Sequence, residues 1–318
     1  MKISGFTMAK NVAKLYYPVK QAILSILPVV DEFVVALGDC DSDDRTRQEI
    51  LSIGSDKIRI IDTVWDIKKY PRGMEHAHQT DIAKSHCTGD WLFYVQSDEV
   101  VHEKYLPLIR TKCEEYLEKK EIEGFLFKYV HFWGDFFHYQ QSHCWYRREI
   151  RIIRNDPEIH SWESAQSFRR IPDFDGLNYR QQHQTFKLKV IGLNAYVYHY
   201  GWVRPPKLMS SKMKAFTANH RGKDKVDEMV RKKKFNGSYD YGPLKRLPVF
   251  ADSHPAVMKE WIDKFDWQEE LRYDGPLSAN QPRAKHDLLK YRFISCIENN
   301  LLGGRRLGEF KNFILVKE

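Results

Sequence analysis

Two short segments of the sequence are rich in carboxylates, and each directly follows an apolar run. Gly38 to Asp44 carries four aspartates after residues 32–37, and Gln96 to Glu99 follows residues 91–95. Grouped carboxylates repel one another, and a bound divalent cation or a set of hydroxyl and amide donors relieves that repulsion. Aspartate is also a common turn residue, so the first segment alone fits a solvated loop equally well. The second segment is the sharper indication of a cation site.

The spacing of apolar residues indicates the elements that position these carboxylates. Four runs rich in β-branched and aromatic residues predict strands, at residues 3–8, 32–37, 57–61 and 91–95. Three helices are predicted between these strands. The first ends near Val30, the second ends at about Ile53, and the third spans Gln79 to His86. This alternation predicts an α/β fold with an open, mostly parallel sheet flanked by helices. Ligands of such sheets bind beyond the carboxyl ends of the strands, where both carboxylate segments fall.

The second half of the chain has a different pattern. A helix is predicted from Pro107 to about Lys120, and aromatic, strand-like runs then follow at residues 125–134, 145–146 and 151–154. These runs predict that the sheet becomes mixed. From Pro205 onward the pattern is helical and charged. We therefore expect one domain over residues 1–205 and a mainly helical C-terminal region over residues 206–318.

Length and composition limit the class of protein. The chain has 318 residues, of which 42% are hydrophobic, and no apolar run approaches the roughly 20 residues that span a bilayer. The apolar stretch Ile3 to Met8 is too short for a secretion signal. Five cysteines, an odd number without a Cys-x-x-Cys pair, indicate reduced thiols. We therefore expect a cytoplasmic protein.

The formal net charge of +8 is compatible with nucleic acid, an anionic membrane surface or an anionic substrate. No nucleic-acid-binding signature accompanies the charge, so we expect no nucleic acid partner. The densest basic run, Arg231 to Lys234, lies in a polar segment. A solvated helix face is the common explanation of such a run, and peripheral contact with a membrane is the alternative.

Several segments together resemble the family 2 inverting glycosyltransferases, which have the GT-A fold. The resemblance covers about the first 110 residues and rests on four motifs in order: Ile3–Asn11, Phe33–Thr46, Gln79–Asp81 and Gly89–Glu99. Shorter landmarks follow at Arg151–Arg154, His160–Glu163 and Val197–Arg204. The resemblance implies metal-assisted, inverting transfer of a sugar from a nucleotide diphosphate-sugar, with a UDP-sugar favoured, to a hydroxyl of a glycan or lipid-linked acceptor. It further implies polysaccharide or glycoconjugate biosynthesis, at the inner face of the membrane.

The resemblance assigns residues 1–110 to nucleotide-sugar binding and residues 111–205 to the acceptor side. The residues implied to contact the donor are Thr7 and Ala9 at the nucleobase, Asp39 and Asp41 at the base or ribose, Gln96 at the ribose, and Arg204 at a phosphate. An arginine in a structural ion pair would look the same as Arg204 does in the sequence. Cys40 stands where the family has a glycine, which leaves the identity of the nucleotide open.

The family binds its metal through an Asp-Xaa-Asp motif, and this chain has Gln96-Ser97-Asp98. The resemblance implies that Asp98 is the ligand of Mn²⁺ or Mg²⁺, while the amide of Gln96 adds no charge and makes weaker metal binding an expectation. His199 is implied as a further metal or phosphate contact. A lone histidine among tyrosines is as often a core residue.

The acceptor hydroxyl must lose its proton to a base, a role that suits a carboxylate. Glu163 is the candidate for this base, with Asp173 and Asp175 in reserve, although an exposed glutamate in an aromatic loop would look the same. Among the tryptophans, Trp162 is the candidate to stack on an acceptor sugar because it adjoins Glu163. Large aromatic residues more often serve the core.

Two other functions are compatible with parts of this pattern. A sugar nucleotidyltransferase shares the α/β architecture, but it needs a glycine-rich phosphate loop after the first strand, and Phe6 to Asn11 has no glycine. A catalytically silent nucleotide- or glycan-binding protein is suggested by Gln96.

Overall fold

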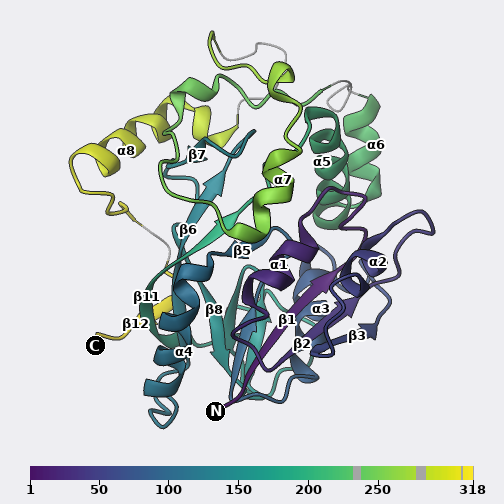
Figure 1. The fold of residues 1–318 in the computed structure, drawn as a ribbon, viewed down its shortest axis with the longest axis vertical. Coiled ribbons are helices and arrows are strands. Elements are labelled where there is room, and N and C mark those ends of the chain that lie inside the picture. The colour runs from purple at the N-terminus through teal and green to yellow at the C-terminus, as the bar shows by residue number, and fades with distance from the viewer. Residues whose placement is uncertain (232–237, 277–283, 309–310, 318) are drawn as a thin grey trace.

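The computed structural model describes residues 1–231, 238–276, 284–308 and 311–317 (Figure 1). Over these residues a central sheet is flanked by helices, so the predicted α/β fold is confirmed. In spatial order the strands are β12 (Phe313–Leu315), β11 (Leu188–His199), β6 (Gly124–Phe132), β8 (Arg148–Arg154), β4 (Trp91–Tyr94), β1 (Ile3–Ala9), β2 (Glu32–Leu37) and β3 (Ile58–Asp62). Two short strands lie outside this order: β5 (Glu99–Val101) pairs with β11, and β7 (Tyr139–Gln140) pairs with β6.

The direction of the strands decides which residues meet at each edge of the sheet. Strands β4, β1, β2 and β3 run parallel, and so do β6, β11 and β12. Between these two groups β8 runs antiparallel to both β4 and β6. The two groups therefore point the same way, and the carboxyl ends of β4 and β11 lie at one edge.

The helices and a hairpin complete the fold. The helices are α1 (Val19–Ile26), α2 (Thr46–Leu51), α3 (Met74–Ser85), α4 (Leu106–Glu115), α5 (Pro206–Arg221), α6 (Lys223–Arg231), α7 (Lys259–Asp263) and α8 (Leu289–Asn300). Single 3₁₀ turns lie at Glu103–Tyr105, Leu244–Arg246, Ala256–Met258, Gln268–Glu270 and Lys285–Asp287. Strands β9 (Ile159–Trp162) and β10 (Ser167–Arg170) form a separate antiparallel hairpin.

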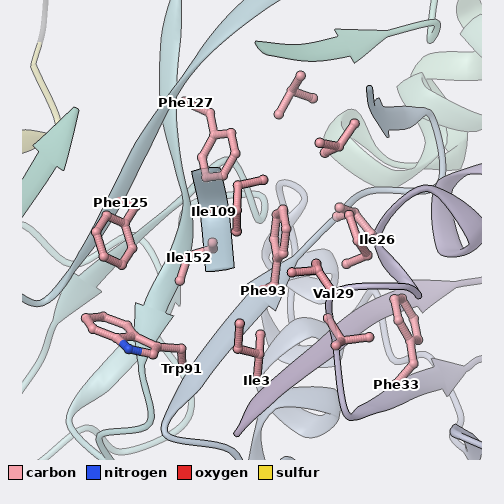
Figure 2. Packing of buried hydrophobic residues seen from close by; sticks show 14 of the residues in the cluster. Ile3, Ile26, Val29, Phe33, Trp91, Phe93, Ile109, Phe125, Phe127 and Ile152 are labelled. Carbon is pink, nitrogen blue, oxygen red and sulfur yellow. The ribbon is translucent and has the colours of Figure 1, made fainter. Parts of the chain in front are cut away.

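Side chains of the central strands alternate between two buried layers. One layer packs against α1 and α4 and contains Ile3, Phe33, Trp91, Phe93 and Phe125 (Figure 2). The other layer packs against α3 and the β9–β10 hairpin and contains Phe6, Val34, Leu92, Tyr94 and Phe168. Burying one large apolar side chain stabilises a fold by about 1.5–3 kcal/mol, so this alternation accounts for the runs seen in the sequence.

A third, strongly aromatic cluster joins the C-terminal segment to the ends of β6 and β11. Trp267 donates from Nε1 to the carbonyl oxygen of Gly134 at 3.0 Å, and Trp133 stacks on Trp202 with ring centroids 4.8 Å apart. Strand β12 adds a further contact, because it pairs in parallel with β11. The domain boundary expected at residue 205 stays a prediction, and the segment beyond it supplies both a core and a strand.

None of the helices within the described ranges is both long and apolar enough to cross a membrane. The five cysteines are unpaired. Of the basic run Arg231–Lys234, residues Lys232–Lys234 lie outside the described residues, so the expectation of a solvated helix face or a membrane contact is not examined by the structure.

Candidate functional site

Asp98 and His199 meet where two strands end at the same edge of the sheet. Asp98 precedes β5, whose first residue, Glu99, pairs with His199 at the end of β11. The backbone N–H of Tyr200 donates to the carbonyl oxygen of Asp98 at 2.8 Å. Asp98 Oδ2 consequently lies 3.4 Å from His199 Nε2, and both residues are 7% exposed. The two residues expected to hold a metal are thus brought together.

A second histidine determines how His199 presents its ring. His131 Nε2 lies 2.7 Å from the carbonyl oxygen of Tyr146, which can only accept, so Nε2 carries the proton. Burial lowers the pKa of His131 well below its usual value, which keeps the ring neutral and makes its Nδ1 an acceptor. His199 Nδ1, at 3.1 Å, must then be the donor. His199 Nδ1 is thus engaged within the protein, and Nε2 is the ring atom that faces Asp98.

Two buried basic side chains from the segment after β11 lie beside Asp98. Lys212 on α5 places Nζ 3.9 Å from Asp98 Oδ2, and Arg204 is fully buried. Both side chains donate to the carbonyl oxygen of Gly201. Burial alone would raise the pKa of the Asp98 carboxyl, but His199, Lys212 and Arg204 hold that pKa well below its usual range. Asp98 is therefore an ionised carboxylate, while burial lowers the pKa of the Lys212 amine.

The Asp98 and His199 pair fits a divalent cation. Two ligand atoms each about 2.1 Å from one ion, at an angle of about 90–109°, lie about 3.0–3.4 Å apart. The observed separation is 3.4 Å. A Cβ at Gly201 would lie 2.6 Å from His199 Nε2 and closer still to Asp98 Oδ2, so only glycine leaves this position open. Among the described residues, no group of three or more carboxylates, histidines or cysteines is placed so that it could hold a metal ion.

The other residues of the Gln96 to Glu99 segment are held by the protein. Gln96 Nε2 donates to the carbonyl oxygen of Ala165 at 2.9 Å, so the amide expected at the ribose is engaged with the β9–β10 hairpin. Glu99 is fully buried and forms a bidentate ion pair with Arg151, with both N–O distances at 2.7 Å. Asp98 and Glu99 thus point to different surroundings.

The residues expected to bind the donor nucleotide lie in two environments. Thr7 and Ala9 are buried in the sheet, at 1% and 0% exposure. Asp39 accepts from Lys10 Nζ at 2.7 Å, and Asp41 accepts from Lys14 Nζ at 3.0 Å, so lysines compensate the acidic loop. The nucleotide contacts predicted for these residues, and for the buried Arg204, stay predictions.

A group of polar side chains that was not anticipated from the sequence lies beyond the end of β3. The backbone N–H of Trp65 donates to Asp39 Oδ1 at 2.9 Å, which places this tryptophan beside the acidic loop. Four buried side-chain atoms in this region have no hydrogen-bond partner: Thr63 Oγ1, Trp65 Nε1, Glu75 Oε2 and Gln79 Oε1. Unsatisfied buried polar atoms are rare, so their grouping indicates a place where a polar ligand or water completes the bonding. Gln79 belongs to a quoted motif, but nothing in its spacing indicated this grouping.

The candidate base lies on the β9–β10 hairpin. Glu163 follows β9 and has a φ of 59°, and Ala165 has a φ of 60°, a left-handed conformation that non-glycine residues rarely adopt. Trp162 and Glu163 both line a cavity of about 430 Å³. Asp173 and Asp175, the reserves, are exposed and line neither this cavity nor a second cavity of about 1110 Å³ beside it.

Three residues of the site were not anticipated from the sequence: His131, Gly201 and Lys212. His131 lies within a run of aromatic strand residues, and Lys212 is one of several lysines in a charged helix. Gly201 lies within the quoted landmark Val197–Arg204, two residues after His199, and a glycine there was the one available signal.

Comparison with known proteins shows that the chain is similar to several solved structures. No protein-family model and no curated protein matches the chain. TarS from S. aureus has 15% identity and a TM-score of 0.39, over 75% of this chain and 44% of TarS. Its 1–349 form in complex with UDP has 15% identity and a TM-score of 0.35, over 73% of this chain and 70% of that chain.

Glucosyl-3-phosphoglycerate synthase from Mycobacterium tuberculosis, solved with Mn²⁺, UDP and phosphoglyceric acid, is also similar. It has 21% identity and a TM-score of 0.28, over 41% of this chain and 43% of that chain. The chain thus spans less than half of the length of the full TarS structure and of this synthase.

Proposed function

We propose that this protein is a glycosyltransferase that moves a sugar from a nucleotide diphosphate-sugar, with UDP as the expected nucleotide, to a hydroxyl of a glycan or lipid-linked acceptor. The observation that supports it best is the Asp98 and His199 pair at the carboxyl edge of the sheet. Their facing oxygen and nitrogen atoms are 3.4 Å apart beside two buried basic side chains. Ligands of α/β sheets bind at this edge.

Asp98 Oδ2 and His199 Nε2 would hold the cation. Bound there, a divalent cation supplies charge stabilisation for the departing diphosphate. Because Mg²⁺ takes oxygen ligands almost alone, a pair that includes an imidazole favours Mn²⁺. Arg204 and Lys212 add basic groups on the same side, and Asp98 keeps its negative charge among them.

The transfer itself needs a base on the acceptor side. In an inverting reaction the acceptor oxygen forms a bond to the anomeric carbon as the bond from that carbon to the diphosphate oxygen breaks. The acceptor proton passes to the Glu163 carboxylate, and the bonding electrons leave with the diphosphate. Glu163 suits this role because it is part-exposed, with 28% side-chain exposure, and lines the cavity beside Trp162.

A nucleotide-release assay with a panel of nucleotide-sugars tests the proposal. The wild type should release UDP from at least one UDP-sugar in the presence of Mn²⁺, and chelation should stop the release. Glu163→Gln should lower transfer by about 10²–10⁴-fold and leave donor affinity nearly unchanged. No release from any nucleotide-sugar would contradict the proposal, and loss of transfer in Asp173→Asn alone would move the base to Asp173.

A further inference from the structure

Three separate segments enclose the cavity of about 430 Å³. They are residues 143–149, which lead into β8, the hairpin residues 162, 163, 166 and 167, and residues 306, 308, 312 and 313 around the start of β12. None of the residues that follow β1, β2 or β4 lines it. The cavity is therefore built by other segments than the loops that follow these strands.

Three of the lining residues have a buried side-chain atom without a hydrogen-bond partner. These atoms are Glu149 Oε2, Ser167 Oγ and Asn312 Nδ2, in residues exposed by only 5%, 1% and 6%. An unsatisfied buried polar atom costs about 1–3 kcal/mol, and folded proteins contain few. Only nine such atoms occur in the described structure, and three of them are in residues that line this one cavity. Such a grouping indicates a ligand that supplies the missing partners.

The three atoms differ in what they offer. A carboxylate oxygen accepts, a hydroxyl donates and accepts, and an amide nitrogen donates, which together match several hydroxyl groups on one molecule. Trp162 lines the same cavity, and indole rings pack on the apolar faces of pyranoses. A polar set of mixed donors and acceptors beside an aromatic ring is the chemistry that recognises a sugar.

The cavity also adjoins the proposed reaction centre. Tyr146 lines it, and the Tyr146 carbonyl oxygen accepts from His131, which is bonded to His199. On the other side, Gln166 Nε2 donates to Glu149 Oε1 at 2.9 Å, while the preceding residue, Ala165, accepts from Gln96. The cavity wall is thus hydrogen-bonded to His131 beside His199, and its lining residue Gln166 directly follows Ala165, the partner of Gln96.

A second cavity, of about 1110 Å³, shares residues 145–148 and Arg306 with the first. Its other lining residues are rich in aromatic side chains, including Tyr129, Tyr139, Tyr196, Tyr198 and Phe250. The shared wall places a larger, aromatic space next to the smaller, polar one. Such a space accommodates further sugars of a chain.

We propose that the smaller cavity binds the acceptor sugar of a glycan, with its hydroxyl groups on Glu149, Ser167 and Asn312, and that the larger cavity holds the rest of the glycan. This inference rests on the proposed function. It assigns the acceptor to the chemical class of glycans. Glu163 lines the cavity in which the acceptor sugar would bind, and a hydroxyl of that sugar would give its proton to Glu163.

Saturation-transfer NMR with methyl glycosides of glucose, galactose, mannose and N-acetylglucosamine tests the proposal. At least one glycoside should bind the wild type loaded with UDP and Mn²⁺, and Ser167→Ala should weaken that binding by about tenfold or more. Asn312→Asp should do the same, because it keeps the oxygen bonded to Arg169 and removes the amide donor.

Ser161→Ala is the matched control. Ser161 lies on the same hairpin, is fully buried, and has an Oγ without a partner, but it does not line the cavity. Equal effects of Ser161→Ala and Ser167→Ala would overturn the proposal, and so would the absence of binding by every glycoside.

Two further experiments distinguish a failure of this proposal from a failure of the proposed function. If UDP-glucose displaces the glycoside and UDP does not, the cavity is a donor subsite and the proposal is wrong. The glycoside titration is also repeated without nucleotide. If UDP and Mn²⁺ do not bind the wild type but a glycoside does, the proposed function is contradicted and the cavity proposal is not.

Discussion

At the scale of single residues, the Asp98 carboxylate is the group on which metal-assisted donor binding should depend. Its Oδ2 faces nitrogen atoms of His199 at 3.4 Å and Lys212 at 3.9 Å. Asp98→Asn removes the negative charge and should weaken Mn²⁺-dependent UDP binding by at least about tenfold, or about 1.4 kcal/mol. Calorimetric titrations with and without Mn²⁺ measure this effect.

The choice of control for Asp98→Asn follows from the structure. Glu99 is unsuitable, because it is fully buried and bonded to Arg151, and breaking a buried pair destabilises a protein by about 3–5 kcal/mol. Asp62→Asn at the end of β3 is better matched, since that carboxylate is 72% exposed. Equal UDP affinities of Asp98→Asn and Asp62→Asn in Mn²⁺ would contradict the assignment.

Gly201→Ala should abolish binding of Mn²⁺ while the sheet still forms. The added Cβ would lie 2.6 Å from His199 Nε2 and closer to Asp98 Oδ2, so the two ligand atoms must separate. Gly192→Ala on β11 is the control, because its nearest neighbour, a side-chain carbon of Leu315, is 3.4 Å away. Electron paramagnetic resonance of Mn²⁺ would report the loss. A variant that binds Mn²⁺ as the wild type does would remove Gly201 from the site.

The carboxyl group of Glu149 should make stability depend on pH. Burial raises its pKa to about 7, despite the opposing effect of Arg151. A carboxyl whose pKa is higher in the folded state contributes stability at low pH, and that contribution is lost as the pH rises toward 7. Glu149→Gln should therefore gain in melting temperature relative to the wild type between pH 5 and pH 8. The exposed Glu118→Gln should show no such trend, and a difference that is constant with pH would contradict the prediction.

At the scale of elements, the Asp81 side chain on α3 makes two polar contacts with the β9–β10 hairpin. Asp81 accepts from the backbone N–H of Ser161 at 2.8 Å and lies 2.7 Å from His160 Nδ1. Asp81→Asn should lower the free energy of unfolding by about 1–3 kcal/mol, measured by chemical denaturation. Asp56→Asn, an exposed change, should have little effect. If both variants unfold alike, the hairpin does not depend on Asp81.

The sequence predicted the strands better than the helices. Residues 32–37 form β2 with the predicted bounds, because a fully buried strand is a continuous apolar run. Helix α3 begins at Met74, earlier than the predicted Gln79, since its first turn follows Gly73 and has mixed polar residues that hide the helical period. The 12 residues of β11 and the short β12 were not anticipated individually, because their pairing partners are distant in the sequence.

At the scale of the whole molecule, bound ligands should stabilise the fold through the edge of the sheet. A ligand that binds only the folded state at 100 times its Kd adds about 2.7 kcal/mol. UDP with Mn²⁺ should therefore raise the melting temperature by about 4 °C, while either ligand alone should raise it less. Asp98→Asn should lose the combined effect. A rise that is the same without Mn²⁺ would contradict a shared site.

The meeting of Asp98 with His199 is a property of the whole sheet. Both residues were expected at a metal from the resemblance, but their contact requires β8 to run antiparallel between β4 and β6, so that β4 and β11 end at one edge. The long-range order of strands leaves no local signal in the sequence. The same holds for Lys212, which reaches Asp98 from α5, and for the cavity, whose walls come from three separate segments.

The hydrogen bonds of His131 have a consequence for the movement of protons. The chain of donors runs from His199 to His131 and ends at the carbonyl oxygen of Tyr146, a group that cannot take up and pass on a proton. His199 and His131 therefore cannot relay a proton to the interior of the protein. In the proposed reaction the carboxyl groups available to an acceptor proton are therefore those of Glu149 and Glu163, in the wall of the neighbouring cavity.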